Sequence, residues 1–170
     1  RLFEKDIYFE MAARDIRALP KLEGTVHVNV ALIVKFIANY FFKPAKYPEV
    51  IKQSDEKNDD FLFNQGTTHG LDKIRFHDYR IAYNSMNLPN VKVFKKQVRK
   101  LKLFLLLAKP NKAQRRDIDF LLALGEIFTL VVYGQLILEN AKIYNIDDDI
   151  VDQIFDCMVR DFSKFALQLY

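Results

Sequence analysis

One short run, Glu23-Gly24-Thr25, has the residue types and position best suited to chemistry, because it stands directly ahead of a long apolar stretch. Thr25 is a good N-cap for a helix that starts at Val26, and Gly24 lets another group approach the backbone closely. The exposed N–H groups and the dipole at a helix N-terminus favour anions. The sequence therefore predicts a carboxylate beside an anion-friendly helix end, where it could act as a base next to a phosphate-bearing ligand. The alternative is an ordinary solvated acid in a turn.

The residues ahead of this run sharpen the interpretation. Arg14-Asp15 lies on the preceding amphipathic segment, and Glu23 follows Asp15 by eight residues. An Arg-Asp pair on one helix, followed by a Glu-Gly-Thr turn into the next, resembles the C-terminal signature of acyl-CoA dehydrogenases. The resemblance covers residues 1–43, and the rest of the chain is helical in character without a motif that matches the family.

The resemblance implies an oxidoreductase that uses FAD to dehydrogenate an acyl-CoA or another acyl thioester. It implies that Glu23 is the catalytic base, that Gly24 lies along the substrate and that Thr25 contacts the flavin. His27 stands where the family often has Gln or Glu, and is carried over as a second flavin-binding residue. Arg14 and Asp15 are expected to brace the junction between the two helices.

The domains with which the family binds its flavin are not recognisable in these 170 residues. We therefore expect the chain to be the C-terminal piece of a longer polypeptide, with FAD bound only in the full-length parent and the isolated chain inactive. In larger members of the family a helical extension after the turn packs on the body or mediates assembly, so a homo-oligomer is expected. The alternative is a non-catalytic helical interaction or assembly module that kept the fold.

Composition sets broad limits on the protein. Half of the 170 residues are hydrophobic, and five Gly and five Pro are few, which favours one well-packed domain with an aromatic-rich core over disorder. A net charge of +4 suits an acidic ligand such as a CoA phosphate without requiring one, and no nucleic-acid partner is expected. The single Cys157 excludes an internal disulfide and fits a reducing compartment, so we expect a cytoplasmic location. The histidines and the cysteine show no metal-ligand spacing.

Apolar periodicity predicts an all-α fold, a bundle of about five helices with one long loop. We divide the chain into dehydrogenase-like helices (1–43), a long loop with a short helix (44–90) and a C-terminal helical extension (91–170). The five expected bundle helices cover residues 2–19 (ended by Pro20), 26–42, 91–109, 113–144 and 150–170, and the short helix in the loop region covers 71–83. In the helix over 26–42 Lys35 and Asn39 are expected on one face, and in the helix over 113–144 Gly125 and Gly134 are expected at close-packing points.

Other candidate side chains receive weaker interpretations. The basic face between Lys92 and Lys102 could meet CoA phosphates, an acidic partner or a membrane surface, or could simply be a solvated helix face. His69 is expected in the loop and His77 at the surface, while Cys157 lies on an apolar stripe and is expected to be inert core.

Overall fold

The computed structural model describes residues 7–22 (backbone only for 19–22), 24–45, 70, 73–108 and 110–169. Within these residues the predicted all-α bundle is confirmed, and no strand occurs. The helices are α2 (Ile7–Leu22), α3 (Val26–Ile33), α4 (Ile37–Phe42), α6 (Tyr79–Ser85), α7 (Pro89–Leu107), α8 (Ile118–Tyr144) and α9 (Asp148–Gln168), with short 3₁₀ turns at Val34–Phe36 and Gln114–Arg116.

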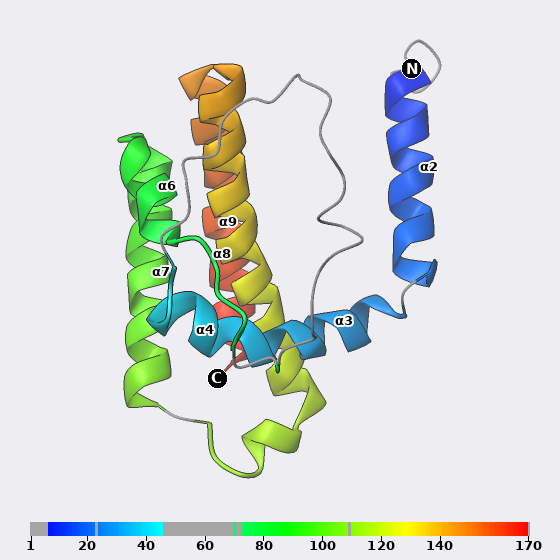
Figure 1. Cartoon of the computed structure of the whole chain (residues 1–170), viewed down its shortest axis with the longest axis vertical. Coiled ribbons are helices and arrows are strands. Elements are labelled where there is room, and N and C mark those ends of the chain that lie inside the picture. The colour runs from blue at the N-terminus through cyan, green and yellow to red at the C-terminus, as the bar shows by residue number, and fades with distance from the viewer. Residues whose placement is uncertain (1–6, 23, 46–69, 71–72, 109, 170) are drawn as a thin grey trace.

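Helix α8 is the centre of the bundle. It packs against α9, α3 and α6, while α7 packs against α9 (Figure 1). The sequence of α8 is apolar all round, which is the pattern of a helix that is buried on most sides. Its start is fixed by Asp117, whose carboxylate accepts from the Asp119 backbone N–H at 3.0 Å. Its end is fixed by Asn145 in the left-handed conformation, with φ of 51°.

Two glycines let neighbouring elements approach α8 closely, as the sequence predicts. A Cβ added at Gly125 would lie 2.4 Å from the backbone oxygen of Val30 in α3. A Cβ added at Gly134 would lie 2.5 Å from the Tyr83 hydroxyl oxygen and 3.2 Å from the Phe94 ring. Any larger residue at position 125 would therefore push α3 away from α8, because a backbone carbonyl cannot move aside as a side chain can.

Aromatic rings fill the core between these helices. Tyr40 of α4 stacks on Tyr79 of α6 with ring centroids 5.2 Å apart, and meets Phe128 of α8 edge to face at 5.2 Å. Farther along the same core, Phe94 of α7 stacks on Tyr83 of α6 and meets Phe155 of α9 edge to face at 5.4 Å. Such offset and edge-to-face pairs add stability beyond their buried area, so the aromatic-rich core expected from composition is confirmed.

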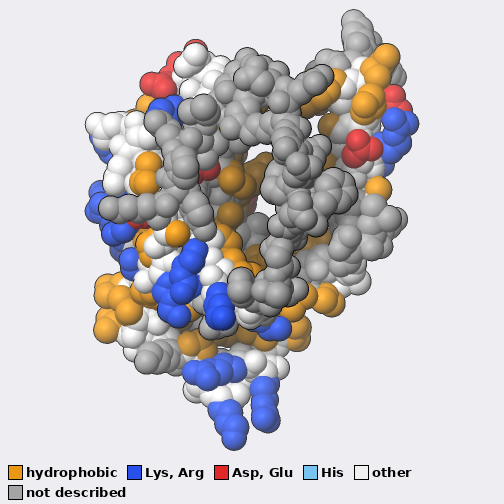
Figure 2. Space-filling view, viewed as in Figure 1, with side chains coloured by type: hydrophobic (Ala, Val, Ile, Leu, Met, Phe, Trp, Pro, Cys, Tyr) orange, Lys and Arg blue, Asp and Glu red, His pale blue; other side chains and the backbone are white. Residues whose placement is uncertain are grey.

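Two features of the surface bear on function. Figure 1 shows α2 standing apart from the other helices, and it exposes most of its large apolar side chains. Lys and Arg side chains gather along the α6–α7 side of the molecule and around its lower end, where α7 connects to α8 (Figure 2).

Several predicted helix boundaries and faces are wrong. Helix α2 continues past Pro20 to Leu22, because a proline in the last turn removes only one backbone hydrogen bond. The helix predicted over 26–42 is interrupted by the 3₁₀ turn, which changes the angular spacing of its residues. As a result Lys35 is exposed and Asn39 is buried, so they do not share a face.

The stripe that the C-terminal helix buries matches the predicted one only in part: Met158 and Phe162 are buried as predicted, whereas Ile154 is exposed. Val151, Phe155 and Met158 face the core, whereas Ile150 and Cys157 are exposed, so the assignment of Cys157 to the core is wrong. The helix predicted from residue 113 begins at Ile118 instead, because the Asp117 cap stands there. The short helix predicted over 71–83 begins at Tyr79. The predicted long loop, including His69, lies almost entirely outside the described residues.

We predict that Gly125→Ala destabilises the protein by about 1–3 kcal/mol, the usual cost of overpacking a well-packed contact. A helical Gly→Ala change without such a contact would instead stabilise by up to about 1 kcal/mol. Urea denaturation followed by circular dichroism measures the free energy of unfolding. Asn140→Ala, at an exposed position of the same helix, serves as the control and should be neutral or stabilising. A gain in stability for Gly125→Ala would show that α3 does not pack so closely on α8.

Candidate functional site

The turn between α2 and α3 contains the residues that the sequence singles out. Glu23 lies outside the described residues. Gly24 has φ of +102°, a conformation that L-residues with a side chain rarely adopt, and the nearest atom to an added Cβ is the Asn29 Oδ1 at 3.9 Å. This glycine is therefore required by the backbone turn rather than by close packing against the described residues.

Thr25 caps α3, as predicted. Its backbone is extended, and its Oγ1 accepts from the Val28 backbone N–H at 3.4 Å. The first turn of α3 contains no acidic residue, so the positive end of its dipole is not neutralised from within the helix. Both Gly24 and Thr25 are exposed, so a ligand can reach this helix end.

The other residues carried over from the resemblance do not converge on the turn. Arg14 forms its ion pair within α2, with Glu10 at 3.8 Å, and Asp15 is exposed. The described contacts therefore do not include a brace between these two residues and α3.

His27 is exposed at the edge of a cleft of about 380 Å³ between α3, α8 and α9. The same cleft is lined by the carboxylates of Asp119 and Glu126, together with apolar residues. Two carboxylates repel the pyrophosphate of a dinucleotide, so the cleft beside His27 does not suit that part of FAD. Among the described residues no group of three or more His, Cys, Asp or Glu side chains could hold a metal ion.

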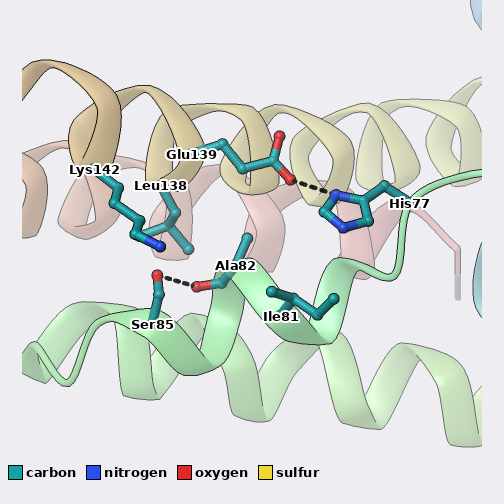
Figure 3. A pocket seen from close by; sticks show the side chains of 7 residues that line it. All are labelled: His77, Ile81, Ala82, Ser85, Leu138, Glu139 and Lys142. Carbon is teal, nitrogen blue, oxygen red and sulfur yellow. Dashed lines mark hydrogen bonds and ion pairs between the residues drawn. The ribbon is translucent and has the colours of Figure 1, made fainter. Parts of the chain in front are cut away.

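A second arrangement of polar side chains crosses the bundle, and the sequence analysis did not find it. The Tyr40 hydroxyl donates to Gln135 Oε1 at 2.6 Å, and Gln135 Nε2 donates to Glu139 Oε1 at 2.8 Å. The same carboxylate oxygen lies 3.4 Å from His77 Nδ1 (Figure 3). These contacts connect α4, α8 and the segment before α6 through one chain of polar groups.

Burial keeps the Tyr40 hydroxyl, at one end of this series of polar contacts, in its protonated form. Desolvation raises the pKa of Tyr40 far above its ordinary value, so the hydroxyl stays protonated and donates at any physiological pH. Desolvation likewise raises the pKa values of Tyr83 and Tyr79. With Tyr40 as donor, the Gln135 amide must accept on its oxygen and donate on its nitrogen, which directs that donor at Glu139.

His77 is half-buried rather than fully at the surface as predicted: its side chain is 17% exposed and its Nδ1 is buried. The cavity beside it has a volume of about 50 Å³, and Ser85, Lys142 and Glu139 contribute to its lining (Figure 3). This space suits a water molecule rather than an organic substrate. The only local sequence signal for this arrangement is Gln135 and Glu139, four residues apart within an otherwise apolar stretch.

Comparisons with known proteins found no match for the chain among family models, curated proteins or solved structures. Among the described residues α8 is the one helix long and apolar enough to cross a membrane. Half of its most apolar window is buried inside the bundle, and a central helix of any fold requires the same composition.

The buried tyrosines predict a loss of stability at alkaline pH. Because the pKa of Tyr40 is raised in the folded state, the unfolded chain loses this proton first above about pH 10, and stability then falls as pH rises. Tyr40→Phe should reduce this slope by about 1.4 kcal/mol per pH unit. At pH 7 it should destabilise by about 1–3 kcal/mol, because the buried Gln135 oxygen loses its donor.

Chemical denaturation between pH 8 and pH 11.5 measures both effects. Tyr133→Phe is the matched control, because Tyr133 is 59% exposed and its removal should change neither the slope nor the stability at pH 7. Identical slopes for Tyr40→Phe and the unmodified protein would contradict the interpretation.

Proposed function

We propose that this chain is the C-terminal helical part of a flavin-dependent acyl-CoA dehydrogenase-like oxidoreductase. In this proposal Glu23 is the base that removes a proton from the carbon next to the thioester carbonyl. The proposal is supported above all by the turn between α2 and α3. There the Gly24 backbone has positive φ and Thr25 caps an apolar helix, directly after the helix that carries Arg14-Asp15.

The local electrostatics suit a base at this position. A base that attacks a C–H bond must be ionised and aimed. Glu23 precedes by two residues the cap of α3, whose N-terminal dipole favours the ionised carboxylate and contains no competing acid in its first turn. A bound acyl chain would exclude water from the turn and make the carboxylate more basic.

Of the two residues proposed to bind the flavin, Thr25 has the more suitable surroundings and His27 the less suitable. Thr25 is exposed, and its hydroxyl hydrogen remains available to a ligand because its oxygen is the acceptor for Val28. A bound flavin would supply the hydride acceptor for the dehydrogenation. His27 is accessible too, but the carboxylates of Asp119 and Glu126 share its cleft, so any contact it makes is with an uncharged part of the cofactor.

Glu23→Gln in the full-length, flavin-containing protein tests the proposed base. The variant keeps the size and hydrogen-bonding capacity of the side chain, so it should bind flavin and acyl-CoA normally. Reduction of the flavin by acyl-CoA should slow by on the order of a hundredfold or more, because general-base catalysis is lost. Single-turnover bleaching of the flavin measures this step without interference from product release.

Asp15→Asn serves as a control that also replaces a carboxylate by an amide on the other side of the turn. It should leave the bleaching rate within a few-fold of the unmodified protein. Near-normal bleaching in Glu23→Gln would place the base on another residue. A preparation of the full-length protein that holds no flavin would reject the oxidoreductase proposal.

A second candidate function, a helical assembly module, is favoured by the apolar surface of α2. Helix α2 carries the following exposed apolar side chains: Ile7, Tyr8, Phe9, Met11 and Ile16. A helix that exposes several large apolar side chains gains stability when a partner covers them, so such a helix suits an interaction site. In this proposal α2 packs against a second copy of the chain, consistent with the homo-oligomer expected from sequence.

Ile16→Gln tests the assembly function by placing a polar side chain of similar size where Ile16 is 65% exposed. If α2 forms the contact, the variant should shift the protein toward the monomer, with self-association at least about tenfold weaker, as expected for the loss of a buried anchor residue. Sedimentation velocity over a concentration series measures this shift. Ile150→Gln, at a 55% exposed position of α9, is the matched control and should leave assembly unchanged. A monomeric unmodified chain would reject the homo-oligomer.

A further inference from the structure

A cationic pocket lies between α6 and α7. Lys95, Arg99 and Lys102 are spaced four and three residues apart on α7, which puts them on one face of the helix. Together with Arg80 of α6 they line a pocket of about 220 Å³. The remaining lining residues are the aromatic and small side chains Tyr79, Tyr83, Asn84 and Val98.

The positive charges of this pocket are only partly neutralised. Arg80 is held by Asp78, with its Nε 2.9 Å from Oδ1 and its terminal nitrogen 2.6 Å from Oδ2. Lys95 donates to the uncharged Asn84 amide oxygen. Within the part of the chain that the structure describes, no carboxylate forms an ion pair with Lys95, Arg99 or Lys102.

The three α7 cations are held close together rather than dispersed. Like charges four residues apart on a helix destabilise it, and the pKa of Lys95 is lowered, first by desolvation and then by the charge of Arg99. Lys102 is held with its Nζ 5.4 Å from the Phe42 ring centroid and 5.9 Å from that of Tyr79. An anion in the pocket would relieve this repulsion, so the arrangement is preorganised for a negative ligand.

We propose that this pocket binds the phosphate group of a phosphate-bearing ligand. The planar guanidinium of Arg99 matches a phosphate oxygen pair, and Lys95 and Lys102 supply two further point charges. Three cations without a carboxylate partner match the charge of a pyrophosphate or phosphate monoester better than that of a single carboxylate. The volume of 220 Å³ is below the roughly 300–1,000 Å³ of sites that enclose a whole small molecule.

The pocket therefore receives the phosphate while the rest of the ligand extends outside. This site is independent of the proposed oxidoreductase function, because it lies between α6 and α7 and uses none of the residues of the α2–α3 turn.

Isothermal titration of the full chain with inorganic pyrophosphate, at constant ionic strength, tests the site. The variant Lys95→Gln/Arg99→Gln removes two charges from the pocket. Its affinity should fall at least about tenfold, since each charge-assisted hydrogen bond contributes more than a neutral one. Lys92→Gln/Lys96→Gln is the matched control, because it removes two charges from exposed positions of the same helix outside the pocket. It should change the affinity by less than about threefold, as expected for exposed, salt-screened charges that do not contact the ligand.

Backbone amide chemical shifts provide a second readout that needs no variant. Pyrophosphate should shift the Arg99 and Lys102 amides of the unmodified chain more than those of Lys92 and Lys96. Equal weakening in both double variants, or uniform shifts along α7, would reduce the effect to general surface attraction and overturn the proposal. Absence of binding to pyrophosphate and to the vesicles below would also overturn it.

The phosphate could belong to a soluble ligand or to a lipid headgroup, and a vesicle experiment distinguishes them. Phosphatidylcholine vesicles with and without phosphatidylinositol 4-phosphate are sedimented with the protein. Binding that requires the phosphorylated lipid and is lost only in Lys95→Gln/Arg99→Gln assigns the phosphate to a headgroup. Pyrophosphate binding without such vesicle binding assigns it to a soluble ligand. If both double variants lose vesicle binding equally, the binding does not depend on the pocket, and the proposal is overturned.

Discussion

The close contact between α3 and α8 is the constraint on which the candidate turn depends. Gly125 lets the backbone of α8 approach the carbonyl of Val30, so the position of α3 is set by a residue one hundred positions after the turn. The N-terminus of α3 is then fixed relative to the bundle, because a helix is rigid over eight residues. The anion-friendly end that Thr25 caps is therefore held in place by the core.

The buried polar chain gives the core a second kind of specificity. Apolar contacts between α4 and α8 would tolerate small shifts of one helix along the other, whereas hydrogen bonds of fixed length do not. Tyr40 and Gln135 each need the other, since an unpaired polar group inside the core costs free energy. Glu139 extends the same constraint to His77 and so to the segment that leads into α6.

Local signals in the sequence were enough to predict the helical class, the Thr25 cap and the close-packing glycines. Each of these depends on neighbours within a turn or on the absence of a side chain. The errors arose where distant contacts decide. Cys157 shares the apolar periodicity of α9, and only the position of α8 determines which of two adjacent stripes is buried. His77 is half-buried where it meets Glu139, 62 residues later, and nothing near it in the sequence indicates that pairing.

The helices differ in how completely their apolar surfaces are covered, and this difference connects the two proposed functions. Helices α8 and α9 pack against each other, whereas α2 exposes most of its large apolar side chains and stands apart from the other described helices (Figure 1). The turn therefore lies between a helix that the core holds and a helix that it does not. A surface that covered α2 would also remove water from beside the turn, and a carboxylate beside a dry helix end is a stronger base than one in bulk water. Assembly through α2 and base catalysis at Glu23 are thus compatible, since the contact that the first requires would create the environment that the second needs.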